Sequence, residues 1–211
     1  MLHPHVPEDL KHFGKHLFAT FLGLIMALGL EQWREHRQEL RLSEESLHRI
    51  EAELRRNRDD TAQRLVRLET EIPVTKAYYE DLERAVAERR AGRKAPLPVR
   101  LKTQNPDFGF TWSAWEGARA TGGLRHIDPT RLQRMSEVYA DMQRFIPIQD
   151  QLMLNPAFAD LLTFAPLEPE SLRPQELDRL LNGFRFNQTW NQSRIRIGRE
   201  MLKELDEALK P

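Results

Sequence analysis

The stretch that decides the fold is residues 17–72, LFATFLGLIMALGLEQWREHRQELRLSEESLHRIEAELRRNRDDTAQRLVRLETEI. Its first part, Leu17–Leu30, has no charged residue, and the sequence becomes highly charged from Glu31 onward. No proline or turn signal separates the two parts, and a helical pattern continues until such a signal ends it. The stretch therefore predicts an apolar helix that runs directly into a long amphipathic helix.

The apolar part predicts a membrane anchor. Its 14 residues are fewer than the roughly 20 that span a bilayer, so its flanks must extend it. Lys15 can reach back toward lipid headgroups, and Trp33 stands where an interfacial aromatic residue belongs. We therefore predict a tail over residues 1–16 and a transmembrane helix over residues 17–33.

Two other interpretations of this segment stay open. A cleaved signal peptide would explain the short apolar core and the small residues around Ala27-Leu28-Gly29. Against it, Glu8 and Asp9 lie in what would be the basic region, and the helical pattern runs through the cleavage site. The third interpretation is a buried core helix of a soluble protein.

The charged part predicts a long helix over residues 34–72 with one apolar seam. Positions seven residues apart carry Trp33, Leu40, Leu47, Leu54, Thr61 and Leu68. Ser43 and Asn57 weaken the second row of the heptad, which favours packing within the domain over a coiled-coil dimer. Pro73 predicts the end of this helix or a kink in it, and a second helix is expected over residues 74–91.

The remaining chain predicts a loop over residues 92–107 and short helices within 111–211. Asp128-Pro129 is typical of a helix start, and Thr121-Gly122-Gly123 is typical of a helix end. Further breaks are expected at Pro147, Asn155-Pro156, Pro166, Pro169, Pro174 and Asn182-Gly183. Because no alternating strand pattern is present, we predict an all-α fold in which residues 34–211 form one irregular helical bundle.

Composition and motifs argue against several function classes. The 32 basic residues equal the 32 acidic ones, which argues against a protein dedicated to binding nucleic acid. No cysteine is present, so disulfides, thiolate zinc sites and cysteine nucleophiles are excluded. Phosphate-binding, dinucleotide-binding, serine-hydrolase and zinc-protease motifs are missing from the sequence. We therefore expect neither an enzyme nor a bound cofactor.

Aromatic residues at helical spacing supply the candidate ligand-binding residues. Trp112, Trp115 and Tyr139 could line a pocket, although tryptophans at this spacing more often pack in a core. Metal ligands are less well supported. Glu45 and His48 form one Glu-x-x-His pair without a second, and His12 with His16 lacks a third ligand. We predict no metal site.

Two sequence blocks resemble a group of bacterial single-span proteins known only as a domain of unknown function. The first is GLIMALGLEQW followed by RIEAELRRN, which ends at Asn57. The second is TWSAWEGARATGGLRHIDPTRLQRMSEVYADMQ, residues 111–143. The resemblance covers about the first three quarters of the chain and implies an anchored all-α domain. It implies no activity.

These observations predict a membrane-anchored helical protein with a structural or protein-interaction role. The alternative is a membrane-tethered sensor or small-ligand-binding module with a pocket near Trp112 and Trp115. The expected partners are the lipid bilayer and either a second copy of the chain or another membrane protein, with no nucleic acid. The lysines of a short N-terminal tail suit an uncleaved signal anchor, so we expect the bacterial inner membrane with the C-terminal domain in the periplasm.

Overall fold

The structure is a computed structural model that describes residues 8–101 and 108–210, with side chains described from residue 17. Within these residues it contains five α-helices, one short 3-10 turn and no strand, so the predicted all-α class is confirmed. The helices are α1 (Glu8–Arg90), α2 (Ser113–Thr121), α3 (Pro129–Met153), α4 (Pro156–Phe164) and α5 (Pro174–Ala208), with η1 at Pro169–Ser171.

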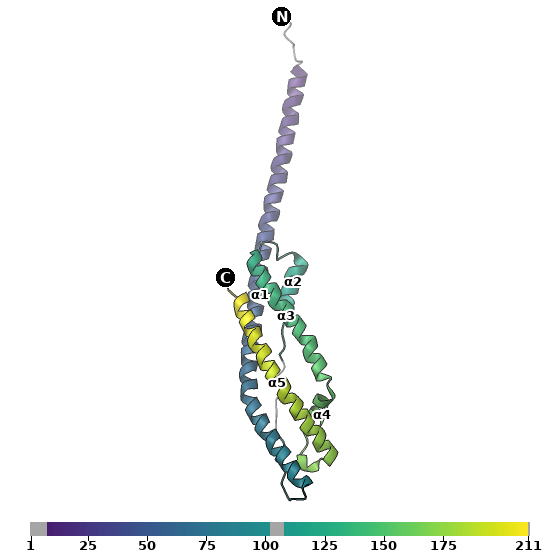
Figure 1. The fold of residues 1–211 in the computed structure, drawn as a ribbon. Coiled ribbons are helices and arrows are strands. Elements are labelled where there is room, and N and C mark those ends of the chain that lie inside the picture. The colour runs from purple at the N-terminus through teal and green to yellow at the C-terminus, as the bar shows by residue number, and fades with distance from the viewer. Residues whose placement is uncertain (1–7, 102–107, 211) are drawn as a thin grey trace.

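Helix α1 is the axis of the molecule. It has 83 residues, which corresponds to roughly 125 Å at about 1.5 Å per residue. Its N-terminal part projects from the bundle without a neighbouring helix among the described residues, whereas its C-terminal part packs against the other helices (Figure 1). Among the described helices, none contains a stretch long and apolar enough to cross a membrane.

Helix α5 returns antiparallel along α1. Four ion pairs mark this direction, since the residue numbers rise along α1 as they fall along α5: Arg58–Asp206, Glu69–Arg199, Glu83–Arg185 and Arg90–Asp178. All four lie at the surface, where such pairs contribute about 0–1 kcal/mol each. The ladder therefore follows from the packing of the two helices rather than causing it.

Three apolar clusters follow one another along the bundle and hold it together. The cluster nearest the projecting part of α1 includes Ile50, Leu54, Trp115, Met135, Tyr139, Met142 and Leu205. A middle cluster contains Leu65, Leu68, Phe108, Phe145 and Trp190. The far cluster includes Tyr79, Leu82, Val86, Phe158, Leu161 and Phe184. Helices α1 and α5 contribute to all three, which makes this pair the spine of the domain.

The predicted seam of α1 is buried only along part of its length. Leu54 and Leu68 are buried, as the seam predicts. Trp33 and Leu40 are exposed, which contradicts the prediction that the seam begins at Trp33. The reason is that α2, α3 and α5 reach α1 only beyond Leu40, so the first positions of the seam have nothing to pack against.

Pro73 does not end the helix, contrary to the prediction of separate helices over 34–72 and 74–91. It lies inside α1, where it removes the backbone donor that would reach the carbonyl of Glu69. Both residues are exposed, so water can bind that carbonyl. Buried Leu68 and Tyr79 on either side pack into different clusters and keep the helix continuous.

Pro147 is likewise accommodated inside α3, on its exposed side, although a break was predicted there. The predicted stop at Asn182-Gly183 is also wrong, because α5 runs through it. Gly183 is buried against α4, and a Cβ there would lie 2.7 Å from the carbonyl oxygen of Ala157. This glycine therefore permits a close helix crossing instead of a turn.

Other helix boundaries follow the predicted signals. Helix α2 is followed by Gly122, whose φ of 77° is the left-handed conformation that glycine adopts at a helix C-terminus. Helix α3 begins at Pro129, and the side chain of Asp128 accepts a hydrogen bond from the amide of Arg131 at 2.9 Å. Helix α4 begins in the same way at Asn155-Pro156.

We expect Leu54→Ala to lower the free energy of unfolding by about 2–5 kcal/mol, because it leaves a cavity at a fully buried position. The matched control is Leu40→Ala, the same change on the same helix at a side chain that is 39% exposed. It should change stability by about 0.5 kcal/mol or less. Chemical denaturation of both variants checks this, and equal effects would contradict the assignment of the core.

We expect Gly183→Ala to destabilise the protein by about 1–3 kcal/mol, because the new methyl group meets the backbone of α4. Gly117→Ala is the control, since a Cβ at this helical glycine meets nothing within 4 Å. That change should stabilise the protein by about 0.5–1 kcal/mol through helix propensity. Thermal and chemical unfolding would refute the close crossing if both substitutions were stabilising.

Candidate functional site

A buried carboxylate on α1 organises the region of the predicted site. Glu53 is 1% exposed, yet both of its oxygens are fully used. Oε2 accepts hydrogen bonds from the hydroxyl of Ser113 and the amide of Ala114, both at 2.9 Å. Oε1 accepts from the Tyr139 hydroxyl at 2.8 Å and the Trp115 amide at 3.4 Å.

Glu53 thereby acts as the N-terminal cap of α2. The N-cap residue of that helix is Trp112, which makes no side-chain capping bond. A capping side chain normally bonds the amides of the second and third helical residues. Here these are Ala114 and Trp115, and the carboxylate of another helix bonds both. Its negative charge also suits the positive end of the helix dipole.

Asn57 lies one turn further along α1 and binds the backbone of Thr111, the residue before the N-cap of α2. Its amide nitrogen donates to the carbonyl oxygen of Thr111 at 2.7 Å, and its Oδ1 accepts from the Thr111 amide at 3.0 Å. Asn57 is 2% exposed, so these bonds satisfy polar groups that water does not reach. Glu53 and Asn57 together fix residues 111–115 on α1.

The predicted pocket residues lie in the core next to these bonds. Trp115 and Tyr139 stack with ring centroids 4.9 Å apart and an interplanar angle of 15°. They are 6% and 1% exposed, so their faces are covered by protein. Trp112 is half-buried against the same cluster. The structure thus brings the three residues together as packing partners.

The environment of Tyr139 also disfavours its ionisation. Burial raises the pKa of Tyr139 far above its usual value, and its hydrogen bond to Glu53 raises it further. The phenol therefore stays protonated and donates to the carboxylate. This suits a structural donor and not a general base, which needs a pKa near the working pH.

The two sequence blocks that carry the family resemblance meet at this point. Glu53 and Asn57 belong to the RIEAELRRN block, while Thr111, Trp115 and Tyr139 belong to the block over residues 111–143. Their hydrogen bonds join the blocks directly. Glu53 and Asn57 therefore have a structural role, because they join the two segments.

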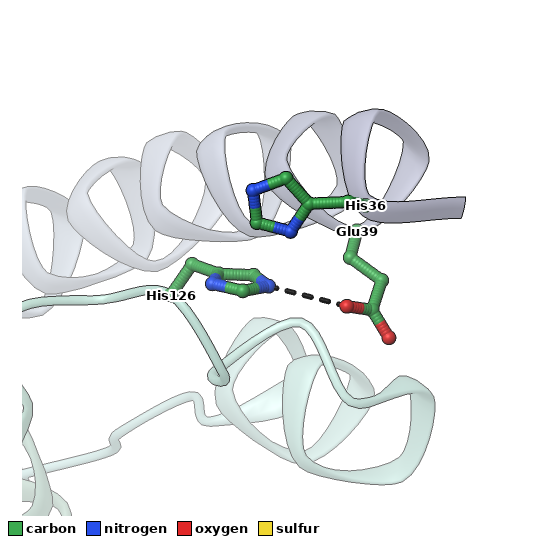
Figure 2. Close-up of side chains that lie close together, drawn as sticks. All are labelled: His36, Glu39 and His126. Atoms are coloured by element: carbon green, nitrogen blue, oxygen red, sulfur yellow. Dashed lines mark hydrogen bonds and ion pairs between the residues drawn. The ribbon is translucent and has the colours of Figure 1, made fainter. Parts of the chain in front are cut away.

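A second cluster, which we call the histidine cluster, consists of His36, Glu39 and His126 (Figure 2). The ligand atoms of the three side chains lie within 4.8 Å of one another. Nε2 of His126 lies 3.3 Å from Oε2 of Glu39, and the two imidazole rings meet edge to face with centroids 5.3 Å apart. The side chains point toward one another from two separate elements.

Hydrogen bonds at the histidine cluster lower the pKa of its carboxylate. His126 and Arg125 both hold the pKa of Glu39 below its usual value, with the hydrogen bond to His126 as the largest cause. Arg125 donates from Nη1 to Oε1 at 2.6 Å. The two oxygens of Glu39 thus have different partners, Oε1 with the guanidinium group and Oε2 with the imidazole.

The loop that carries His126 is seated on α1 by two small contacts. Gly123 is buried against α1, where a Cβ would lie 2.1 Å from the hydroxyl of Ser46, so only glycine lets the loop approach. One turn earlier, the hydroxyl of Ser43 accepts a hydrogen bond from the His126 amide at 3.4 Å. These contacts place His126 beside His36 and Glu39, in the turns of α1 that lie just outside the bundle.

Sequence reasoning did not identify the histidine cluster. His36 and Glu39 are three residues apart on one helix face, which was a usable signal, but His126 is far away in the chain and no local pattern connects it. The pair that was considered, Glu45 and His48, is exposed, and Glu45 contacts Arg49 at 3.7 Å. The other pair, His12 and His16, lies outside the described side chains.

The projecting part of α1 is a third feature. Nine large apolar side chains in Leu17–Leu30 are between 47% and 67% exposed: Leu17, Phe18, Phe21, Leu22, Leu24, Ile25, Met26, Leu28 and Leu30. At about 3.6 residues per turn they cover most of the circumference, and the remaining sector carries only the small uncharged residues Thr20, Gly23 and Ala27. At the end of this run the guanidinium group of Arg37 lies over the ring of Trp33, 4.6 Å from its centroid.

No family model, curated protein or solved structure matches this chain.

We expect Glu53→Gln to lower the free energy of unfolding by about 1–3 kcal/mol, because the amide offers donors where backbone and side-chain donors already point. Glu45→Gln, the same change at an exposed position of α1, should have little effect. Chemical denaturation measures both. If Glu53→Gln were neutral, the carboxylate would not be needed to cap α2.

Proposed function

We propose that the protein is anchored in the bacterial inner membrane through residues 17–33 and that its helical bundle has a structural or protein-interaction role. The observation that carries the proposal is the all-round exposure of the apolar run Leu17–Leu30. A soluble monomer rarely exposes a contiguous apolar patch of more than a few hundred Å², and such patches mark membrane or protein contacts. A helix that is apolar on every side suits lipid better than a partner that covers one face.

The apolar run Leu17–Leu30 is too short to span a bilayer without its flanks. Its 14 residues correspond to roughly 21 Å, which is less than the hydrocarbon core of about 30 Å. The helix continues in both directions, and Trp33 with Arg37 suits one interface. The other flank, residues 8–16, lies outside the described side chains. The anchor therefore requires that this flank enters the membrane or that the bilayer thins around it.

The periplasmic side is proposed for the bundle from the charges next to the anchor. Lys11 and Lys15 lie within a few residues of it on the N-terminal side, which suits a signal anchor with its N-terminus in the cytoplasm. Base counting alone argues the other way, because Arg34, Arg37 and Arg41 follow the anchor. That rule weakens for long translocated domains, so the sidedness needs a direct measurement.

An interaction role is favoured over the ligand-binding alternative by the packing of the aromatic residues. Trp115 and Tyr139 cover each other, and the polar groups beside them are used in capping α2. The remaining candidate, Trp112, is half-buried against the same cluster. A sensor that binds a small molecule here would have to open this packing, whereas a scaffold requires no change.

We expect the full chain to be recovered in the membrane fraction and to resist extraction with carbonate or high salt. Leu22→Arg with Met26→Arg should release it, because each charge at the centre of the run costs about 2.5–3.5 kcal/mol in the membrane. Val66→Arg with Thr70→Arg, at exposed positions of the same helix, should leave it in the membrane. An intact parent chain in the soluble fraction would overturn the anchor.

Sidedness is measured with fusions at the C-terminus. A periplasmic bundle should give an active alkaline phosphatase fusion and a dark fusion to green fluorescent protein. The reverse pair of results would place the bundle in the cytoplasm and direct the search for partners there.

A further inference from the structure

We propose that His36, Glu39 and His126 form a binding site for one divalent transition-metal ion of the Zn²⁺ class. This site does not depend on the proposed membrane anchor. It rests on three side chains of suitable chemistry that α1 and the α2–α3 loop bring to one point, with ligand atoms within 4.8 Å of one another (Figure 2).

The ligand set indicates the class of metal. Imidazole nitrogen suits Zn²⁺, Cu²⁺, Ni²⁺ and Co²⁺, whereas Mg²⁺ and Ca²⁺ prefer oxygen ligands throughout. Two histidines and one carboxylate can hold a tetrahedral ion and leave one position for water. No cysteine thiolate is available in this chain to complete a closed site. The set therefore favours a borderline ion at an open, exchangeable site.

The geometry fits such an ion with small changes. Ligand bonds of about 2.0–2.1 Å at a tetrahedral centre place neighbouring ligand atoms about 3.3 Å apart. Nε2 of His126 and Oε2 of Glu39 are already separated by 3.3 Å. His36 completes the set from an exposed position, so its ring can turn toward the ion without displacing packed atoms.

Arg125 gives the carboxylate a fixed orientation and also limits the affinity. It donates to Oε1 of Glu39, which leaves Oε2 directed at His126 and available as a ligand. A hydrogen bond to the other oxygen of a ligating carboxylate is a common outer-shell arrangement. The positive guanidinium group repels a cation, so we expect weaker binding than at a structural zinc site.

The site lies where α1 leaves the bundle. Leu40 is still exposed, whereas Ser43 and Ser46 are the first residues buried by the α2–α3 loop. His36 and Glu39 lie just above this boundary, and His126 is in that loop. A bound ion would clip the loop to the projecting helix and extend the rigid support of that helix by about two turns. Metal would thereby control how firmly the projecting part is held.

The experiment uses the full chain with Zn²⁺ alone as the probe. His3, His5, His12 and His16 of the tail are changed to Gln in every sample, because these residues could chelate metal by themselves. Competition with a chromophoric chelator gives the stoichiometry and Kd. We expect one equivalent of Zn²⁺, removed by EDTA.

Two substitutions test the ligands, and one serves as the matched control. His36→Ala and His126→Ala should each weaken binding about tenfold or more, as loss of a ligand or its support does. His48→Ala removes another exposed histidine of α1 and should leave the Kd unchanged. No stoichiometric binding by the parent, or equal Kd values for the parent and the His126→Ala variant, would overturn the site.

Hydrogen exchange provides a readout that does not depend on affinity alone. Zn²⁺ should slow exchange of the backbone amides in residues 124–127 of the parent and of the His48→Ala variant. The same amides in the His126→Ala variant should not respond. Because His36, His48 and His126 lie at the surface, circular dichroism should show the same helix content in the three variants and the parent without metal. If Zn²⁺ still protected these amides from exchange in the His126→Ala variant, the proposed link between the loop and α1 through the metal would be wrong.

Discussion

The buried carboxylate of Glu53 is the interaction on which the upper half of the bundle depends. An ionised group removed from water is costly unless hydrogen bonds replace its hydration. Four donors do so here, two from the backbone of α2, one from Ser113 and one from Tyr139. The same bonds satisfy the open end of a nine-residue helix that would be marginal alone. The carboxylate, α2 and α3 are thus each positioned by the others.

The bundle as a whole is built on one long helix that only part of the chain covers. Helices α2, α3 and α5 reach α1 only beyond Leu40, and the rest of α1 projects. The covered part has a seam of apolar residues with charged residues opposite. The projecting part is apolar on all sides over Leu17–Leu30 and charged beyond it. This division into a packed domain and an exposed helix supports the anchor and interaction role proposed above.

The histidine cluster lies at the boundary between these two parts. Its contacts join the α2–α3 loop to α1 beside the point where the helix begins to project. A contact at this position can stiffen or release the projecting part without disturbing the apolar clusters below. The Glu53 bonds, by contrast, lie inside the core and have no such freedom. The structure therefore separates a buried polar site that builds the fold from an exposed one, at which we propose an exchangeable metal ion.

The sequence by itself determined the all-α class, the long helix, and the helix boundaries set by local chemistry, such as Gly122 and Asp128-Pro129. It also indicated that Trp115 and Tyr139 more often pack in a core than line a pocket, because large aromatic residues at helical spacing bury a large area. It misjudged the helix end expected at Pro73 and the break expected at Asn182-Gly183, since a local signal for a break is overridden when packing on both sides keeps the helix continuous. Only the tertiary structure decided that Glu53 caps a helix 60 residues away and that His126 joins His36 and Glu39. Such contacts depend on how the loops bring distant segments together. The periodicity of one segment gives no information about the position of another.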